Sequence, residues 1–335
     1  MVEALLLLTI LVAVAFDFTN GFHDTANAIA TSVSTRALTP HQAVLLSSVF
    51  NLVGAVVTVL FFQAKVSNTI ASTLVFRATL VVIVAALLGA IAWNLLTWYF
   101  GLPSSSTHAL IGGLTGAGIA AAGGLGGIQW TSLGKQLLAL VTSPPAGFLV
   151  AGIFMTLLLL LARGGRPGPL NRSFRRFQVV TAALVSFSHG GNDAQKTMAA
   201  IGMALVATGH LPRFSVPLWV VLLSATAIAF GTYAGGWRII RTLGWRIYKL
   251  DPATGLSAQM MGAAVIQVAS AFGLPVSTTH VVTGSVMGAG AARNLSALRW
   301  GVGANILAAW VLTIPATATI AWVCFAILHT AGLRG

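Results

Sequence analysis

The sequence predicts an all-α integral membrane protein, and three observations support this fold class. Of its 335 residues, 57% are hydrophobic and only 7% are charged, whereas about a quarter of the residues in a soluble domain are charged. The apolar runs are unbroken, as in Leu80–Ile91 and Leu218–Phe230, while the strands of a membrane barrel alternate apolar and polar residues. A spanning helix needs about 20 apolar residues, so the chain has room for about 10 to 12 membrane helices.

The expected spans follow one another along the chain, with short connections between them. They cover residues 4–35, 43–63, 74–100, 128–142, 145–162, 177–208, 214–234, 256–272 and 300–329. Two further segments, 101–122 and 273–292, are flanked by apolar sequence and are rich in Gly, Ser and Thr but free of Lys, Arg, Asp and Glu. Non-helical backbone at membrane depth is tolerated only where protein buries it or where it lines a cavity. We therefore expect both segments to form re-entrant helical hairpins.

Basic residues dominate the charge of the chain, with 18 Lys and Arg against five Asp and Glu. In a soluble protein this balance would indicate nucleic-acid binding, but the positive-inside rule and anionic lipid headgroups account for it in a membrane protein. We expect the lipid bilayer as a partner and no nucleic acid. Basic residues gather within residues 163–176 and 238–249 and at Arg36. These connections are expected in the cytoplasm, which places the N-terminus outside a multi-pass protein.

An internal repeat relates the two halves of the chain. The segment GLPSSSTHALIGGLTGAGIA, which begins at Gly101, aligns with GLPVSTTHVVTGSVMGAGAA, which begins at Gly273. At nearly the same offset, NGFHDTANAIAT aligns with HGGNDAQKTMAA, so that Asp24 superposes on Asp193. Two motif pairs at nearly one offset indicate duplication. The charge bias gives the halves opposite orientations, and inverted repeats with broken helices are typical of secondary transporters whose site lies near the membrane midplane.

The Arg-rich segment 163–176 contains several helix-breaking residues and divides the chain nearly in half. We interpret it as a short basic cytoplasmic linker between two inverted repeats, residues 1–162 and 177–335. Because both halves would contribute to one site, residues 1–335 are expected to form a single transport domain.

Each hairpin carries a run of hydroxyl side chains where a helix is expected to begin. These runs are Ser104–Thr107 and Ser277–Thr279. Hydroxyl groups and the free N–H groups of a helix N-terminus attract anions, so two such ends that converge would bind a tetrahedral oxyanion. Alternatively, the hydroxyls bond carbonyls of their own helix or hold helices together. Their duplication in opposite halves favours a binding site.

Asp24 and Asp193 would lie at membrane depth, where a charged side chain costs about 2.5–3.5 kcal/mol, and we expect them to be functional. Together with the nearby amides of Asn27 and Asn192 and with unwound backbone carbonyls, they offer oxygen ligands for Na⁺ or a carboxylate for a proton. Lys196 is the only Lys or Arg in either signature, and it would offset the charge of Asp193 or of a bound anion.

Other polar residues of these segments have less certain roles. Asp17 has no acidic counterpart in the repeat, because Ser186 aligns with it, so a functional and a structural role both stay open. His108 and His280 match each other in the repeat, which favours bracing of the hairpins over proton transfer.

With these motifs, the sequence resembles the inorganic phosphate transporter (PiT) family, in particular its bacterial low-affinity phosphate permease branch. The resemblance covers essentially the whole chain and rests on GFHDTANA, GGNDAQKT and the two P-x-S-[ST]-T-H hairpins. It implies symport of inorganic phosphate, free or as a metal–phosphate complex, with H⁺ or Na⁺. It also implies alternating access and a location in a bacterial inner membrane.

The resemblance assigns the hairpin hydroxyls to phosphate and the signature residues to the coupling ion or the wall of the site. The phosphate set is Ser105, Ser106, Thr107, Ser277, Thr278 and Thr279. The second set is His23, Asp24, Asn27, Asn192, Asp193 and Lys196, of which Asp24, Asn27 and Asp193 would be the ligands of Na⁺. Lys196 stands where many Na⁺-coupled relatives have Asn, which favours H⁺ coupling. Na⁺ coupling and transport of another oxyanion such as sulfate are the alternatives.

We do not expect an enzyme or a resident cofactor. A nucleophilic Ser needs a base that a third group orients, whereas His108 directly follows its hydroxyl run and is duplicated with it. The sequence has no G-x-x-x-x-G-K-[ST] motif for ATP. A passive anion channel is a further alternative to a carrier, and a homodimer is compatible with this interpretation.

Overall fold

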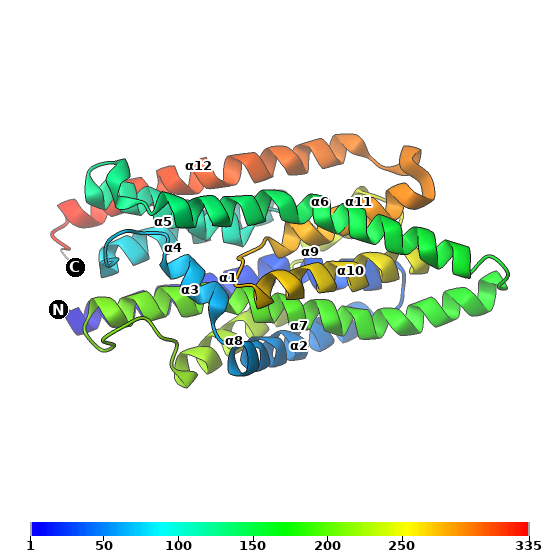
Figure 1. Cartoon of the computed structure of the whole chain (residues 1–335), viewed down its shortest axis with the longest axis horizontal. Helices are drawn as coiled ribbons and strands as arrows, with labels where there is room; N and C mark the ends of the chain where they lie inside the picture. The colour runs from blue at the N-terminus through cyan, green and yellow to red at the C-terminus, as the bar shows by residue number, and fades with distance from the viewer. Residues whose placement is uncertain (1, 334–335) are drawn as a thin grey trace.

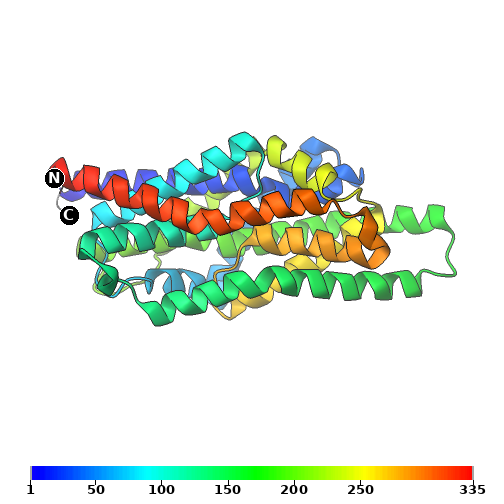
Figure 2. The ribbon, with the colours of Figure 1, turned by 90° about the horizontal axis from the view of Figure 1, so that it is seen from above.

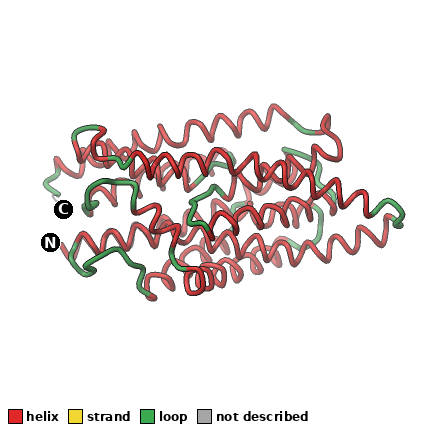
Figure 3. The backbone as a smooth tube through the Cα atoms, viewed as in Figure 1, coloured by secondary structure: helices red, strands yellow, loops and turns green. Residues whose placement is uncertain are grey.

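The computed structural model describes residues 2–333, and this part of the chain is almost entirely helical (Figure 1, Figure 3). The α-helices are α1 (Val2–Ser34), α2 (Pro40–Phe62), α3 (Lys65–Ala71), α4 (Leu80–Phe100), α5 (Ser106–Ala122), α6 (Trp130–Leu161), α7 (Pro167–Ala207), α8 (Leu218–Ala234), α9 (Trp237–Arg241), α10 (Pro252–Ala271), α11 (Thr278–Asn294) and α12 (Trp300–Thr330). Three short turns of helix complete the list: η1 (Leu125–Gly127), η2 (Thr242–Arg246) and η3 (Leu295–Ala297). The predicted all-α fold class is confirmed.

Apolar helices of membrane-spanning length make up much of the bundle. Within residues 2–333, five helices are long and apolar enough to cross a membrane, namely α1, α2, α4, α6 and α12. A sixth span results if α8 and the bent α9–η2 segment are taken together. The second half of α7 is buried against its neighbours. Its polar residues are therefore shielded by protein and not exposed to lipid.

Segments 101–122 and 273–292 each form the tip and the second arm of a helical hairpin, whereas the first arm is the preceding helix, which was expected as a separate span. Residues 101–105 separate α4 from α5, and residues 272–277 separate α10 from α11. Gly101 and Gly273 adopt left-handed backbone conformations, with φ of 65° and 72°, which end the first helix of each hairpin. The hairpins extend from opposite ends of the bundle, and their tips meet near its middle (Figure 1, Figure 2).

Helices of each half pack mainly against helices of the other half. Helix α5 lies along α12 and α11 lies along α6, while α2 packs on α7 and α8 packs on α1. These contacts interlock the halves, so that both hairpins end in one shared interior.

Gly288 lies on α11 where this helix packs tightly against α6, and it allows a stability test. A Cβ atom built there would lie 1.9 Å from the backbone oxygen of Phe148. Gly288→Ala should force the helices apart and cost about 1–3 kcal/mol, as overpacking does. Gly134→Ala on α6 is the control, because a Cβ there meets nothing within 4 Å. Thermal unfolding in detergent should show a lower Tm for Gly288→Ala alone, and equal Tm values for the two variants would contradict the packing.

Two predicted interruptions of the helices are wrong. Helices α1 and α7 run without a break through Asp24 and Asp193, so no unwound carbonyls are available at the signatures. Their glycines serve close packing instead, since a Cβ on Gly21 would lie 2.3 Å from the backbone oxygen of Ile228.

Helix α6 also continues where two spans were expected, through Pro144 and Pro145. Pro144 cannot donate to the carbonyl of Leu140, but the Ser143 hydroxyl lies 3.4 Å from that oxygen and donates to it. A side chain that satisfies the freed carbonyl is one reason that membrane helices tolerate proline.

The basic connections lie together at one end of the bundle. The connection after α1, that between α6 and α7, and the segment after α8 are at this end, and both chain termini are at the other (Figure 1). This arrangement agrees with the charge asymmetry of the sequence. The cytoplasmic assignment of the basic end stays a prediction.

Candidate functional site

The hairpin tips contact α1 and α7 near the middle of the bundle. From the first hairpin, the Ser106 hydroxyl donates to Asp24 Oδ2 at 2.9 Å. From the second, Thr279 donates to Asp24 Oδ1 at 3.3 Å and Thr278 to Asp193 Oδ2 at 3.5 Å. All five side chains are at most 2% exposed. The four sequence motifs therefore form a single buried site.

Lys196 joins the first hairpin to Asp193. Its Nζ donates to Ser106 Oγ at 2.6 Å, to Asp193 Oδ2 at 2.8 Å and to Thr107 Oγ1 at 3.3 Å. Three acceptors match the three protons of an ammonium group. A buried charge is costly unless it is paired and hydrogen-bonded, and this ammonium group meets both conditions while lying beside the hydroxyl run.

Asp24 receives hydrogen bonds from both hairpins and from its own helix. His23 Nδ1 lies 2.6 Å from Asp24 Oδ1, and Nε2 of the same ring lies 3.1 Å from the Thr97 hydroxyl on α4. The ring is buried. The predicted site residue His23 therefore links Asp24 to the arm of the first hairpin.

His189 is a site residue that neither predicted set of site residues includes. The Thr232 hydroxyl donates its one proton to the Ile228 carbonyl, so it can only accept in its contact with Asn51, whose Nδ2 is then the donor. The Asn51 oxygen therefore faces His189 Nδ1, at 3.0 Å. Nδ1 must therefore carry a proton.

The other ring nitrogen of His189 faces carboxylates. Nε2 lies 3.3 Å from Asp193 Oδ2 and 4.0 Å from Asp24 Oδ2. Since carboxylates only accept, a proton on Nε2 or on one carboxyl group is needed to make this contact favourable. The repeat alignment could have drawn attention to His189, because it matches Asn20, another buried polar residue.

The two predicted asparagines hold the second hairpin. Asn27 Nδ2 donates to Thr279 Oγ1 at 2.9 Å and to Thr278 Oγ1 at 3.4 Å. The amide nitrogen of Asn192 lies 3.3 Å from the Val276 carbonyl at the tip, in the orientation that also lets its oxygen accept from Ser270 Oγ at 2.7 Å. Both amides therefore fix the position of the hydroxyl run.

Ser105 and Ser277 occupy the N-cap positions of α5 and α11. Ser105 Oγ accepts from the backbone N–H of His108 at 3.1 Å, and Ser277 Oγ accepts from that of His280 at 3.2 Å. N-cap side chains satisfy free N–H groups of the first turn. These two hydroxyls start the helices whose next residues enter the network.

His108 and His280 contact each other across the two hairpins behind the site. Their ring centroids are 4.5 Å apart, and His280 stacks on Trp310 with centroids 3.7 Å apart. Trp310 also donates to the Pro103 carbonyl at 3.0 Å. This geometry supports the bracing interpretation of both histidines.

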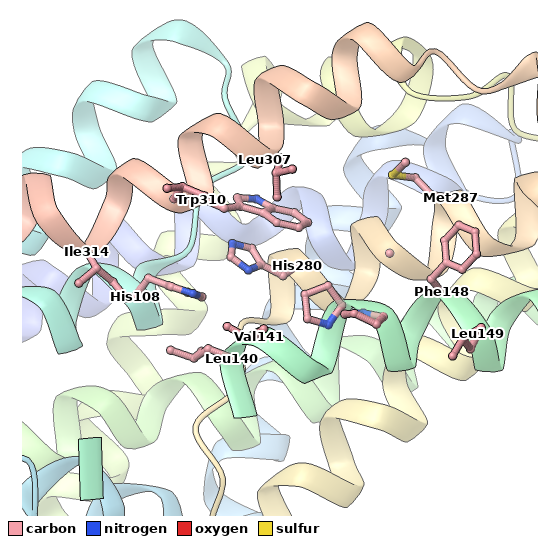
Figure 4. A pocket seen from close by; sticks show the side chains of 14 residues that line it. His108, Leu140, Val141, Phe148, Leu149, His280, Met287, Leu307, Trp310 and Ile314 are labelled. Atoms are coloured by element: carbon pink, nitrogen blue, oxygen red, sulfur yellow. The ribbon is translucent and has the colours of Figure 1, made fainter. Parts of the chain in front are cut away.

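A cavity of about 740 Å³ lies on the outer side of this stack, between α6, α11 and α12 (Figure 4). The histidines and Trp310 lie among Leu, Val, Ile, Pro, Phe and Met side chains. A dianion or monoanion is poorly stabilised by such walls. The network around Asp24 and Asp193, and not this cavity, therefore has the chemistry of an oxyanion site.

Hydroxyl groups of the hairpins can be tested as ligands with an isosteric change. Thr278→Val removes a hydroxyl in the network, and loss of a hydrogen bond to a charged group costs about 1.5–3 kcal/mol. We expect the apparent affinity for phosphate to fall about ten- to hundredfold. Thr283→Val on the same helix is the control, because the buried Thr283 hydroxyl has no hydrogen-bond partner within residues 2–333. Concentration-dependent uptake measures both, and equal affinities would make the hydroxyl run structural.

This chain is similar to proteins that are described as phosphate transporters. The profile of the Phosphate transporter family matches residues 20–167 and 162–321. A "Probable low-affinity inorganic phosphate transporter" of Bacillus subtilis (strain 168) is 47% identical over 98% of this chain and 99% of its own length. A protein of the same description from Rhizobium meliloti (strain 1021) is 47% identical over 94% of each chain. A solved structure titled "The sodium-dependent phosphate transporter" superposes with a TM-score of 0.89 at 26% identity, over 98% of this chain and 99% of that one.

Proposed function

Because this chain belongs to the phosphate transporter family, we propose that it carries inorganic phosphate by proton symport and alternating access. Its family and its relatives are transporters and not enzymes, and phosphate is the transported substrate. The multi-pass helical fold agrees with a membrane location. The coupling ion, the transport cycle, the ligating residues and a bacterial inner membrane are the proposed parts.

The observation that carries proton coupling is the position of the Lys196 ammonium group. It lies within hydrogen-bond distance of Asp193 and of two hydroxyls of the first hairpin, where a cation between carboxylate and phosphate would be useful. A tethered cation supplies that charge without a dissolved Na⁺. It also leaves the carboxylates of the site free of Na⁺, and His189 Nε2 lies 3.3 Å from one of them and 4.0 Å from the other.

Phosphate is proposed to bind between the hairpin tips. The phosphate oxygens would replace Asp24 and Asp193 as partners of the Ser106, Thr278 and Thr279 hydroxyls, and they would accept from Lys196 Nζ. The N-termini of α5 and α11 add free N–H groups and the positive ends of two helix dipoles. Asp193 would keep its contact with the ammonium group, which limits its repulsion of the anion.

Contacts between the repeats support alternating access. Thr242 after α9 donates to the Gly101 carbonyl at 2.8 Å, and Thr69 of α3 donates to the Gly273 carbonyl at 2.7 Å. Each hairpin tip is thus held by a short helix of the other repeat, in matching positions. Opening one contact while the other stays closed would expose the shared site to one side at a time.

Na⁺ coupling is the second candidate, favoured by one geometric observation. Ligand atoms of Asp24, His189 and Asp193 lie within 4.8 Å of one another. Asn27 adds an oxygen that has no hydrogen-bond partner in the described residues. Carboxylate and amide oxygens suit a hard cation, and the structural relative is titled as sodium-dependent. Lys196 argues against it, since its ammonium group places a donor beside Asp193 Oδ2.

Counterflow in proteoliposomes tests the carrier and its substrate together. Vesicles loaded with unlabelled phosphate should take up labelled phosphate faster than empty vesicles do, because a carrier exchanges substrate across the membrane. Excess sulfate outside should compete weakly, and replacing Na⁺ with choline throughout should leave the rate unchanged. A rate that does not depend on the loaded phosphate would indicate a channel, and a rate that requires Na⁺ would favour the second candidate.

A further inference from the structure

Asp17 is a buried acid that the network around the hairpins does not use. It lies on α1 seven residues before Asp24, which corresponds to about 10 Å along a helix. Its side chain is 0% exposed, and neither carboxyl oxygen has a hydrogen-bond partner within residues 2–333. Asn20, one turn further along α1, is equally buried, and its amide is equally unpartnered. An unpartnered polar group at membrane depth costs free energy, so its presence there indicates a function.

The other two buried acids are compensated and Asp17 is not. Asp193 contacts the Lys196 ammonium group at 2.8 Å, and Asp24 accepts hydrogen bonds from a histidine and from both hairpins. Near Asp17, the Thr197 hydroxyl donates to the Ala13 carbonyl instead. A carboxyl group without donors is most stable in its neutral, protonated form.

Charges on α7 act on Asp17 in opposite directions. Thr197, the residue after Lys196, donates to the Ala13 carbonyl one turn before Asp17, so Lys196 lies on the part of α7 that packs against this part of α1. A nearby positive charge favours a carboxylate, and a nearby negative charge such as that of Asp193 disfavours it. Of the other elements that pack against α1, α4 and α8 contain no charged residue. The arginines belong to α9 and η2, which lie beside the C-terminal half of α1, where a Cβ on Gly236 would meet the backbone of Phe22. Burial favours the protonated form of Asp17, and Lys196 is the nearby charge that favours its carboxylate.

This balance links phosphate binding to proton binding. An anion that neutralises Lys196 removes the positive charge that favours the Asp17 carboxylate, so the acid form gains stability. A proton on Asp17 in turn leaves the charge of Lys196 available for the anion. The two ligands therefore bind cooperatively through Lys196, which is the condition for symport.

We propose that Asp17 binds the proton that is transported with phosphate. The proton comes from water, converts the Asp17 carboxylate to the acid when phosphate reaches Lys196, and returns to water when phosphate leaves on the other side. Asp17 precedes Asp24 on α1, so it lies on the side of the site toward the N-terminal end of that helix. This assignment rests on the proposed proton coupling and specifies the residue that performs it.

Asp17→Asn tests the assignment, because an amide cannot exchange a proton. In Na⁺-free vesicles, phosphate counterflow should continue, whereas accumulation driven by an inward proton gradient should fall at least tenfold. Asp17→Glu should retain accumulation with a changed dependence on pH, since the carboxyl group is kept. Ser186→Ala, at the position that matches Asp17 in the repeat, should accumulate phosphate like the wild type. Size-exclusion chromatography in detergent checks that each variant is folded.

Three results would overturn the assignment. If Asp17→Asn accumulates phosphate like the wild type, Asp17 does not bind the coupled proton. If Asp17→Asn and Asp17→Glu both lose counterflow, Asp17 is needed for folding or for phosphate binding. If the wild type itself does not respond to the proton gradient, proton coupling fails as a whole, and this result is distinguished from the others without any variant.

Discussion

Asp24→Asn and Asp193→Asn should each abolish concentrative phosphate uptake while the protein stays folded in the membrane. Asp24 accepts from a hydroxyl of each hairpin, so its charge orders both tips around the site. Asp193 compensates Lys196, and breaking a buried ion pair by removing one partner costs about 3–5 kcal/mol. An amide of the same shape accepts weaker hydrogen bonds and carries no charge.

Uptake of labelled phosphate into proteoliposomes measures this effect, with size-exclusion chromatography to confirm folded protein. The control is Glu3→Gln, the same chemical change at a side chain that is 75% exposed and far along α1 from the site. It should transport normally. Near-normal concentrative uptake by both Asp variants would exclude Asp24 and Asp193 from coupled transport.

Lys196→Asn should have the second large effect, a loss of transport in the absence of Na⁺. Without the ammonium group, Asp193 and the first hairpin lose the cation that joins them, and the anion loses its only buried Lys or Arg within residues 2–333. At about 3–5 kcal/mol for an unpaired buried charge, the rate should fall more than a hundredfold. The amide oxygen of Asn adds a ligand for a hard cation, so added Na⁺ should restore part of the rate.

Initial uptake rates in choline and in Na⁺ buffers distinguish these outcomes. Lys135→Asn, which changes an exposed lysine on α6, is the matched control and should behave like the wild type in both buffers. A Lys196→Asn protein that transports normally without Na⁺ would reduce Lys196 to a structural partner of Asp193. Recovery in Na⁺ would show that the tethered and the dissolved cation serve one purpose.

The arrangement of the site followed largely from the internal repeat. Matching Gly101 with Gly273 and Asp24 with Asp193 indicated which segments meet, because inverted repeats place equivalent breaks face to face. The hydroxyl runs and both acids indeed share one hydrogen-bond network. Their ligand roles stay predictions that the variants above test.

Helix continuity was harder to predict, because glycine and proline occur both where a helix is interrupted and within continuous membrane helices. The glycines of the signatures suggested unwound backbone, but they allow helices to approach closely, as Gly190 does against the backbone of Asn51. Pro144 suggested a connection between spans, but the neighbouring Ser143 hydroxyl satisfies the freed carbonyl. Whether the helix is interrupted or continuous depends on residues of the packed neighbouring helices, which the local sequence does not specify.

The role of His189 depended on contacts distant in the chain. Its tautomer follows from Asn51 on α2, and the orientation of Asn51 follows from Thr232 on α8, 181 residues later. Such a chain of partners is visible only once the helices are packed. The unpartnered state of Asp17 could not be predicted from the sequence for the same reason.

The equilibrium distribution of phosphate tests proton symport most directly. Na⁺-free vesicles are held at a fixed external pH while the internal pH is varied, with both sides below the second pKa of phosphate so that its ionic form changes little. For each proton carried with phosphate, one pH unit supplies about 1.4 kcal/mol, so accumulation should rise about tenfold per unit of inward proton gradient. A phosphate distribution that does not depend on the proton gradient, and that follows a Na⁺ gradient imposed in separate vesicles, would contradict the account.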